Sequence, residues 1–129
     1  MKVVLDTNVI VSAILTPKGT AAKAVGLVSS GTLIPCYDLR ILDEYQTVLL
    51  RAKFSFDKAL IFQFLTLIQD VGLKVISEPS AIDLHDESDR KFYDTAKVTS
   101  AYLVTGNTKH FPKEDWILTP AEIVRLFTN

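Results

Sequence analysis

The sequence predicts an α/β fold, a three-layer α/β/α sandwich in which helices cover both faces of a central parallel sheet. Three observations lead to this prediction. Segments with the pattern of strands alternate with segments of helical periodicity along the chain. The first strand candidate is an unbroken apolar run, which is typical of a strand buried on both faces. No repeat or low-complexity tract interrupts the alternation.

The chain has 129 residues, enough for one domain over residues 1–129 to bury a core without disulfides. Hydrophobic residues make up 48% of the sequence and charged residues 22%, which excludes a disordered or fibrous protein. No run of about 18 uncharged apolar residues occurs, and no basic leader precedes a cleavage site. We therefore expect a cytoplasmic protein with no membrane partner. The single cysteine, Cys36, is expected in the core.

The first strand candidate is Val3-Val4-Leu5, and it stops at Asp6-Thr7-Asn8. In open parallel sheets, ligands bind just outside the carboxyl ends of the strands, so Asp6 has the position of an active-site residue. The same tripeptide also suits a turn or a helix N-cap, and these interpretations stay open.

The segment up to residue 72 continues the alternation. After a loop at Thr16–Gly19, the pattern predicts a helix over Ala21–Val28, which Gly31 closes, and then a strand over Leu33–Cys36. Asp38 is expected to cap the next helix, whose apolar positions are Ile41, Leu42, Tyr45, Val48 and Leu49. Asp57 opens a further apolar helix, which ends at Gly72. The last two helices are expected to pack together as a hairpin.

The second half follows the same pattern. It predicts a strand over Leu73–Ile76, a polar loop over Ser77–Ser88, a helix that begins at Asp89, strands over Tyr102–Thr105 and Trp116–Leu118, and a final helix. The segment Thr119-Pro120-Ala121-Glu122 combines an N-cap Thr, a Pro at the first helical position and a capping-box Glu, and so marks the start of the final helix.

Three carboxylates follow successive strands: Asp6 after the first, Glu44 on the helix after the second, and Asp89 at the helix start after the third. Each alone also suits an ordinary role, such as an exposed helix residue for Glu44 or an N-cap for Asp89. In a parallel sheet, however, all three positions lie at the carboxyl edge and can converge. Carboxylates that converge repel one another unless a cation compensates, and such oxygen donors suit Mg²⁺ or Mn²⁺ better than zinc.

A fourth polar segment, Thr105-Gly106-Asn107, follows the next strand. Gly106 allows close approach of the backbone to a ligand, and Asn107 offers an amide oxygen. We therefore place Asn107 among the candidate catalytic residues, with Thr105 as a supporting residue. The net charge is -1, so any binding of a polyanion must be local. A divalent cation among the acids would reverse the local field.

Four segments of the sequence resemble the PIN-domain nucleases, and more narrowly the PIN-family toxins of bacterial and archaeal toxin–antitoxin systems, the VapC-like ribonucleases. The segments are Val3-Val4-Leu5-Asp6-Thr7-Asn8-Val9, Leu42-Asp43-Glu44-Tyr45, Asp86-Glu87-Ser88-Asp89-Arg90-Lys91-Phe92 and Leu103-Val104-Thr105-Gly106-Asn107. The resemblance covers nearly the whole chain in the right order. It implies a PIN-like, Rossmann-like form of the three-layer sandwich.

The resemblance also implies a function. Asp6, Glu44 and Asp89 would bind Mg²⁺ or Mn²⁺ for hydrolysis of RNA phosphodiester bonds, without a covalent enzyme intermediate. Thr7 and Asn8 would orient Asp6. The implied partners are an RNA substrate, an antitoxin protein and a second copy of the chain in a homodimer.

The sequence departs from the family pattern at Asn107, where many relatives have aspartate. This departure lowers the charge available for a second ion. Either Asp86 or Asp94 offers compensation, and we favour Asp86 because it lies in a loop, whereas Asp94 is about 140° round the helix from Asp89. The departure also keeps open an alternative function, a catalytically weak PIN scaffold that binds RNA or protein.

Lysine, arginine and histidine residues close in sequence to the acids are candidates for gripping the substrate, although each also suits a solvated surface. These candidates are Arg90, Lys91, Lys109 and His110. Two other phosphate-handling folds fit less well. A response-regulator receiver domain needs an acidic pair after the first strand and an Asp directly after the third, and the sequence has neither. A haloacid dehalogenase needs Asp-x-Asp where this chain has Asp6-Thr7-Asn8.

Overall fold

A computed structural model describes residues 1–128, and the predicted domain limit at residue 129 lies just outside them. Within these residues, five strands form one sheet in the order β3-β2-β1-β4-β5. Every pair of neighbouring strands is parallel. The strands are β1 (Lys2–Leu5), β2 (Ile34–Tyr37), β3 (Leu73–Lys74), β4 (Tyr102–Val104) and β5 (Ile117–Leu118).

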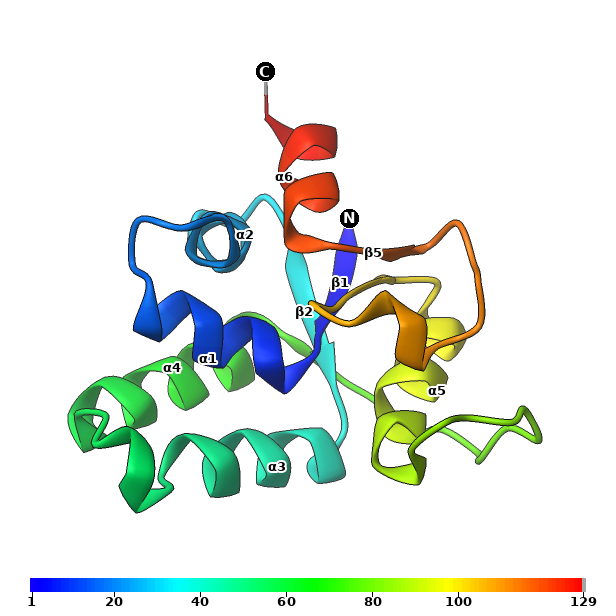
Figure 1. The fold of residues 1–129 in the computed structure, drawn as a ribbon, viewed down its shortest axis with the longest axis horizontal. Coiled ribbons are helices and arrows are strands. Elements are labelled where there is room, and N and C mark those ends of the chain that lie inside the picture. The colour runs from blue at the N-terminus through cyan, green and yellow to red at the C-terminus, as the bar shows by residue number, and fades with distance from the viewer. Residues whose placement is uncertain (129) are drawn as a thin grey trace.

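Helices flank the sheet on both sides, as Figure 1 shows: α1, α2 and α4 lie on one side of β1 and β2, and α5 lies on the other. The helices are α1 (Thr7–Leu15), α2 (Thr20–Ser29), α3 (Leu39–Leu49), α4 (Lys58–Val71), α5 (Arg90–Thr99) and α6 (Pro120–Phe127), with 3₁₀ turns η1 (Ala52–Phe54), η2 (Glu87–Asp89) and η3 (Thr108–His110). This arrangement confirms the predicted three-layer fold. Among residues 1–128, no helix is long and apolar enough to cross a membrane.

The register of the sheet places β1 between β2 and β4. Val3 pairs with Pro35 on one side and with Tyr102 on the other. Because all strands are parallel, their carboxyl ends meet at one edge, where α1 and α3 begin. The backbone N–H of Asp6 still bonds to the carbonyl of Val104 at 2.9 Å, so the pairing of β1 with β4 extends to the first acidic residue.

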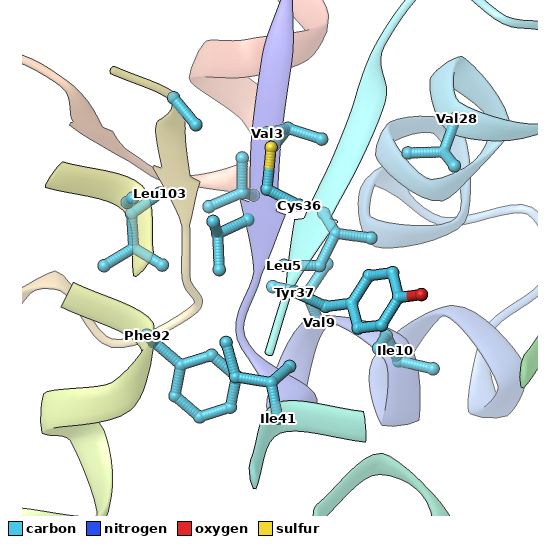
Figure 2. Close-up of a cluster of buried hydrophobic side chains, with 14 of the residues drawn as sticks. Val3, Leu5, Val9, Ile10, Val28, Cys36, Tyr37, Ile41, Phe92 and Leu103 are labelled. Atoms are coloured by element: carbon cyan, nitrogen blue, oxygen red, sulfur yellow. The ribbon is translucent and has the colours of Figure 1, made fainter. Parts of the chain in front are cut away.

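The core lies against both faces of the central strands. Val3 and Leu103 are fully buried in the sheet itself. Figure 2 shows Phe92 of α5 on one side of β1, and Ile10 of α1 and Val28 of α2 on the other. Cys36 is buried in this cluster, as the sequence predicts.

The predicted helix starts are confirmed by their caps. The side chain of Asp38 accepts from the N–H of Ile41, and that of Asp57 accepts from the N–H of Ala59. Thr119 and Glu122 form the predicted capping box at the start of α6. Gly72 ends α4, and a Cβ there would stand 2.2 Å from the carbonyl oxygen of Ile68, so this close passage of backbone requires glycine.

Two elements differ from the sequence predictions by more than one residue at an end. Helix α1 was not predicted. The strand predicted over Leu73–Ile76 is shorter, because β3 ends at Lys74 and only one further bond, from Val75 N–H to the carbonyl of Tyr37, comes after it. Ile76 is 89% exposed, so the chain has left the sheet at that point.

Candidate active site

Asp6 stands directly after β1, at the N-cap position of α1, but its side chain makes no capping hydrogen bond. Instead, Oδ2 accepts from the hydroxyl of Thr105 at 2.8 Å and from the side-chain amide of Asn8 at 3.3 Å. The carboxylate is buried. Asp6 therefore occupies the N-cap position of α1, but its carboxylate points toward Thr105, directly after β4.

Burial raises the pKa of Asp6 from 3.8 to about 6. The hydrogen bond from Thr105 opposes this rise, and the negative charges of Asp89 and Glu44 add to it. The three acids predicted from the sequence are thus close enough to interact electrostatically. A carboxylate whose charge is so unfavourable attracts a cation.

Glu44 lies on α3, and both of its carboxylate oxygens have partners. The hydroxyl of Thr7 donates to Oε2. Oε1 forms an ion pair with Lys91, whose Nζ lies 2.8 Å away. The sequence analysis predicted that Thr7 orients Asp6, and the structure corrects this: the hydroxyl of Thr7 is bonded to Glu44.

Tyr45, the next residue on α3, fixes the helix to the sheet. Its hydroxyl donates to the carbonyl of Leu5 at 2.5 Å, and the side chain is buried. The bond links α3 to the last residue of β1, one position before Asp6. The sequence analysis treated Tyr45 only as part of an apolar face. A buried tyrosine hydroxyl needs a partner, and that requirement was the available signal.

Asp89 forms the end of η2 and the N-cap position of α5, where its side chain makes no capping bond. Burial raises its pKa, and the charge of Asp86 raises it further, against the opposing effect of His110 and Lys91. Its Oδ2 atom is buried and has no hydrogen-bond partner. Nδ1 of His110 lies 3.5 Å from it, which is long for a hydrogen bond. Asp89 therefore keeps one acceptor atom unpaired.

Asn107 is held by its neighbours on the β4 side. Its backbone N–H donates to the hydroxyl of Thr105 at 3.0 Å, and its side-chain nitrogen lies 2.9 Å from Nε2 of His110. The amide nitrogen can only donate, so the amide oxygen of Asn107 takes no part in this contact. The neighbouring N–H of Gly106 donates to Oδ1 of Asn8 at 3.1 Å and so links the segment after β4 to α1.

Asp86 and Asp94 lie in different surroundings. The exposed carboxylate of Asp86 accepts from the N–H of Ser88, which lowers the pKa of Asp86, and its charge acts on Asp89. Asp94 is buried and accepts from the N–H of Ser80 at 3.1 Å. It faces the loop before α5. Its other oxygen, Oδ1, is buried without a hydrogen-bond partner. The charge of Asp86 acts on Asp89, and the choice of Asp86 as the additional acid stays a prediction.

The predicted gripping residues have different roles. Arg90 is occupied, since its guanidinium pairs with Glu87 at 2.6 Å and donates to the carbonyls of Ser80 and Ile82. It builds the loop before α5 and is not available to a substrate. Lys109 is exposed.

A groove of about 820 Å³ borders Glu44 and Lys91, between α3 and the start of α5. Its other charged lining residues are Arg40, Asp43, Arg51, Glu87 and Arg90. Both signs of charge occur along it. The groove thus reaches one of the three candidate acids, Glu44, and it is not a uniformly basic surface.

No three His, Cys, Asp or Glu side chains within residues 1–128 already stand in an arrangement that holds a metal ion. Both oxygens of Glu44 are engaged by other residues, one by Thr7 and one by Lys91. The donor set nevertheless fits a hard divalent cation. Asp89 has an unpartnered buried oxygen and Asp6 carries a raised pKa, so both carboxylates gain from a cation between them.

Comparison with known protein families identifies the family to which the chain belongs. The family model described as the PIN domain matches residues 2–109, the segment that carries all three acids. The chain belongs to the PIN domain family. PIN domains are in general nucleases that use divalent metal ions, so this PIN domain has a nuclease-type function and nucleic acid as its class of substrate.

One curated relative is an uncharacterized protein of Methanocaldococcus jannaschii. It is 28% identical to this PIN domain over 110 residues, which cover 83% of the chain and 71% of the relative. No solved structure matches.

Proposed function

We propose that this PIN domain is a Mg²⁺- or Mn²⁺-dependent endoribonuclease that hydrolyses phosphodiester bonds of RNA. The observation that carries the proposal is the buried carboxylate of Asp6, whose pKa of about 6 reflects its burial and the charges of Asp89 and Glu44. Structural carboxylates are usually paired with cations or bonded to backbone N–H groups. Two acids with raised pKa values, Asp6 and Asp89, together with the nearby charge of Glu44, are typical of a cation site.

In this proposal, Asp6, Glu44 and Asp89 hold the cation, and Asn107 adds its amide oxygen. A divalent ion bound there supplies positive charge that polarises the phosphate and acidifies water. Thr105 keeps Asp6 in place by hydrogen bonding. Supporting roles also fall to Asn8 on Asp6, Thr7 on Glu44 and Asp86 beside Asp89.

The test is cleavage of a labelled single-stranded RNA by the purified protein with Mg²⁺, with Mn²⁺ and with a chelator. Asp6→Asn keeps the size of the side chain and removes its charge, so we expect the rate to fall at least about 100-fold. Asp115→Asn, at an exposed turn, is the matched control and should cleave as the unmodified protein does. Full cleavage by Asp6→Asn, or cleavage that survives the chelator, would reject the proposal.

A second candidate function is a catalytically weak PIN scaffold that binds RNA or protein. Asn107 favours it, because an amide takes the place of a fourth negative charge. Isothermal titration with Mn²⁺ separates the two functions. A nuclease binds the ion and loses activity in chelator, whereas a degenerate scaffold binds RNA equally well with and without the ion.

We also propose that the protein is the toxin of a toxin–antitoxin system, with an antitoxin partner and a homodimeric assembly. Support comes from the sequence resemblance and from an apolar hollow of about 470 Å³ that α1, α2 and α4 line. Expression in a bacterial host should arrest growth, and Asp6→Asn should not. Sedimentation of the purified chain measures the assembly, and a monomer at micromolar concentration would contradict the dimer.

A further inference from the structure

Lys91 is a lysine with an unusually complete set of contacts. Its Nζ atom lies 2.8 Å from Oε1 of Glu44, donates to the carbonyl of Ser88, and stands 5.1 Å from the ring centre of Phe92. The side chain is only 14% exposed. The ammonium group is therefore held at a defined place beside the acids and does not move freely in solvent.

The contacts of Lys91 distinguish Glu44 from the other two acids. Burial disfavours the charge of Asp6, and Asp89 keeps a buried oxygen without a partner. Glu44, by contrast, already has a positive charge in direct contact with it. The chain has thus neutralised one of the three acids with its own ammonium group, and this pairing occupies one of the two oxygens of Glu44.

We propose that Lys91 is an internal counter-ion that competes with the divalent cation for Glu44. The inference rests on the proposed function. When a cation binds, Glu44 exchanges the ammonium group for the ion, and the ammonium group is released into the groove that both side chains line. There it can contact a phosphate of the RNA. Through Lys91, binding of the cation to the acids thereby strengthens binding of the RNA substrate.

A simpler role for the same pair is a structural tie between α3 and α5. The two roles predict opposite changes in metal affinity upon removal of the lysine. A structural tie leaves the affinity for Mn²⁺ unchanged or weakens it, because the acids lose their support. A competing counter-ion holds the affinity down, so its removal makes Mn²⁺ bind more tightly.

The experiment compares Lys91→Met, Lys91→Arg and Lys97→Met with the unmodified protein. Lys97 lies on the same helix, stands over Tyr93 at 5.8 Å and is exposed, so it is the matched control. Isothermal titration should give Lys91→Met about 10-fold tighter Mn²⁺ binding, a change of the size that residues beside metal ligands produce. Lys91→Arg and Lys97→Met should bind the ion as the unmodified protein does.

Thermal unfolding gives a second measurement that needs no RNA. In chelator, Lys91→Met should melt at a lower temperature than the unmodified protein, and added Mn²⁺ should raise its melting temperature more. Both differences should vanish in a Glu44→Gln background, since the lysine then has no charge to neutralise. With saturating Mn²⁺, cleavage of RNA by Lys91→Met should show a raised KM, because the released ammonium group no longer contacts phosphate.

The outcomes separate this inference from the proposed function. If the unmodified protein cleaves RNA with Mn²⁺ but Lys91→Met binds the ion no more tightly than Lys97→Met, the counter-ion role is overturned and the nuclease stands. If the unmodified protein neither binds Mn²⁺ nor cleaves RNA, both are overturned. Tighter binding by Lys91→Met that persists with Glu44→Gln would also reject the role, since the competition must act through Glu44.

Discussion

Thr105 uses its single hydroxyl twice. Oγ1 donates to Oδ2 of Asp6 at 2.8 Å and accepts from the backbone N–H of Asn107 at 3.0 Å. The side chain is fully buried, so no water competes for either bond. Thr105, directly after β4, therefore sets the positions of both Asp6, directly after β1, and Asn107.

We expect Thr105→Val to weaken Mn²⁺ binding and RNA cleavage by about 10- to 100-fold, the usual effect of removing a group that orients a metal ligand. The change keeps the shape of the side chain and removes both hydrogen bonds. Titration with Mn²⁺ and a cleavage assay measure it. Activity equal to that of the unmodified protein would show that Asp6 needs no support from Thr105.

Thr95 provides the matched control, because it is also a fully buried threonine but its hydroxyl has no partner. Thr95→Val removes a polar group that gains nothing from burial. This variant should keep its activity, and its free energy of unfolding, measured by urea denaturation, should be about 1 kcal/mol higher. A loss of activity in this variant would mean that replacing a buried threonine by valine disturbs the fold in general, so that the effect of Thr105→Val would not be specific.

At the scale of elements, the residue that directly follows α5 has a backbone conformation that a serine disfavours. Ser100 has φ 55° and ψ 37°, the left-handed region, and its side chain is exposed. Glycine has no Cβ and adopts this conformation without strain. Ser100→Gly should therefore raise the free energy of unfolding by about 1 kcal/mol. Ser12→Gly, at an exposed position inside α1, should lower the free energy of unfolding by about 0.5–1 kcal/mol. Urea denaturation measures both changes. If both glycine variants were stabilised, or both destabilised, the explanation from backbone conformation would be wrong.

Helix α1 shows where local sequence patterns stop being informative. Its residues Val9, Ile10, Val11 and Ile14 are β-branched, and such side chains favour strands. The helix forms because Val9 and Ile10 pack into the core beside β1, and this packing outweighs the local preference. By contrast, α3, α4 and α6 were predicted because their capping side chains act within a few residues.

For the whole molecule, the sequence predicted the edge of the sheet that carries the acids, but it did not predict how their side chains are paired. Parallel strands bring their carboxyl ends to one edge, and the charges of Asp89 and Glu44 act on Asp6 there. That the three acids form one site stays a prediction. The ion pair of Lys91 with Glu44 depends on how closely α5 approaches α3. That distance is set by the packing of the entire core, and no pattern along the chain encodes it.

Asp6 makes the stability of the whole molecule depend on pH. In the unfolded chain this carboxyl ionises near 3.8, and in the folded protein near 6. Between these values the folded state binds more protons, so the free energy of unfolding falls as the pH rises. About one pH unit above the folded pKa, near pH 7, the loss is complete and amounts to about 3 kcal/mol.

Asp6→Asn should therefore be more stable than the unmodified protein by about 1–3 kcal/mol at pH 7.5 in chelator. The advantage should shrink toward zero near pH 4, where Asp6 is protonated as the protein folds. Urea denaturation at several pH values measures it, with Asp115→Asn as the control that shows no such trend. An advantage that stays constant with pH would mean that the charge of Asp6 does not destabilise the folded protein.

The hydrogen bond between Asp6 and Thr105 joins residues 99 positions apart. A ribosome adding about 5 to 20 residues per second delivers the acid about 5 to 20 seconds before the hydroxyl that holds it. For most of that interval β2 is already available to pair with β1, but β4 and the hydroxyl that holds the carboxylate of Asp6 are still missing. The candidate site of a nascent chain is therefore incomplete until β4 and Thr105 have been synthesised.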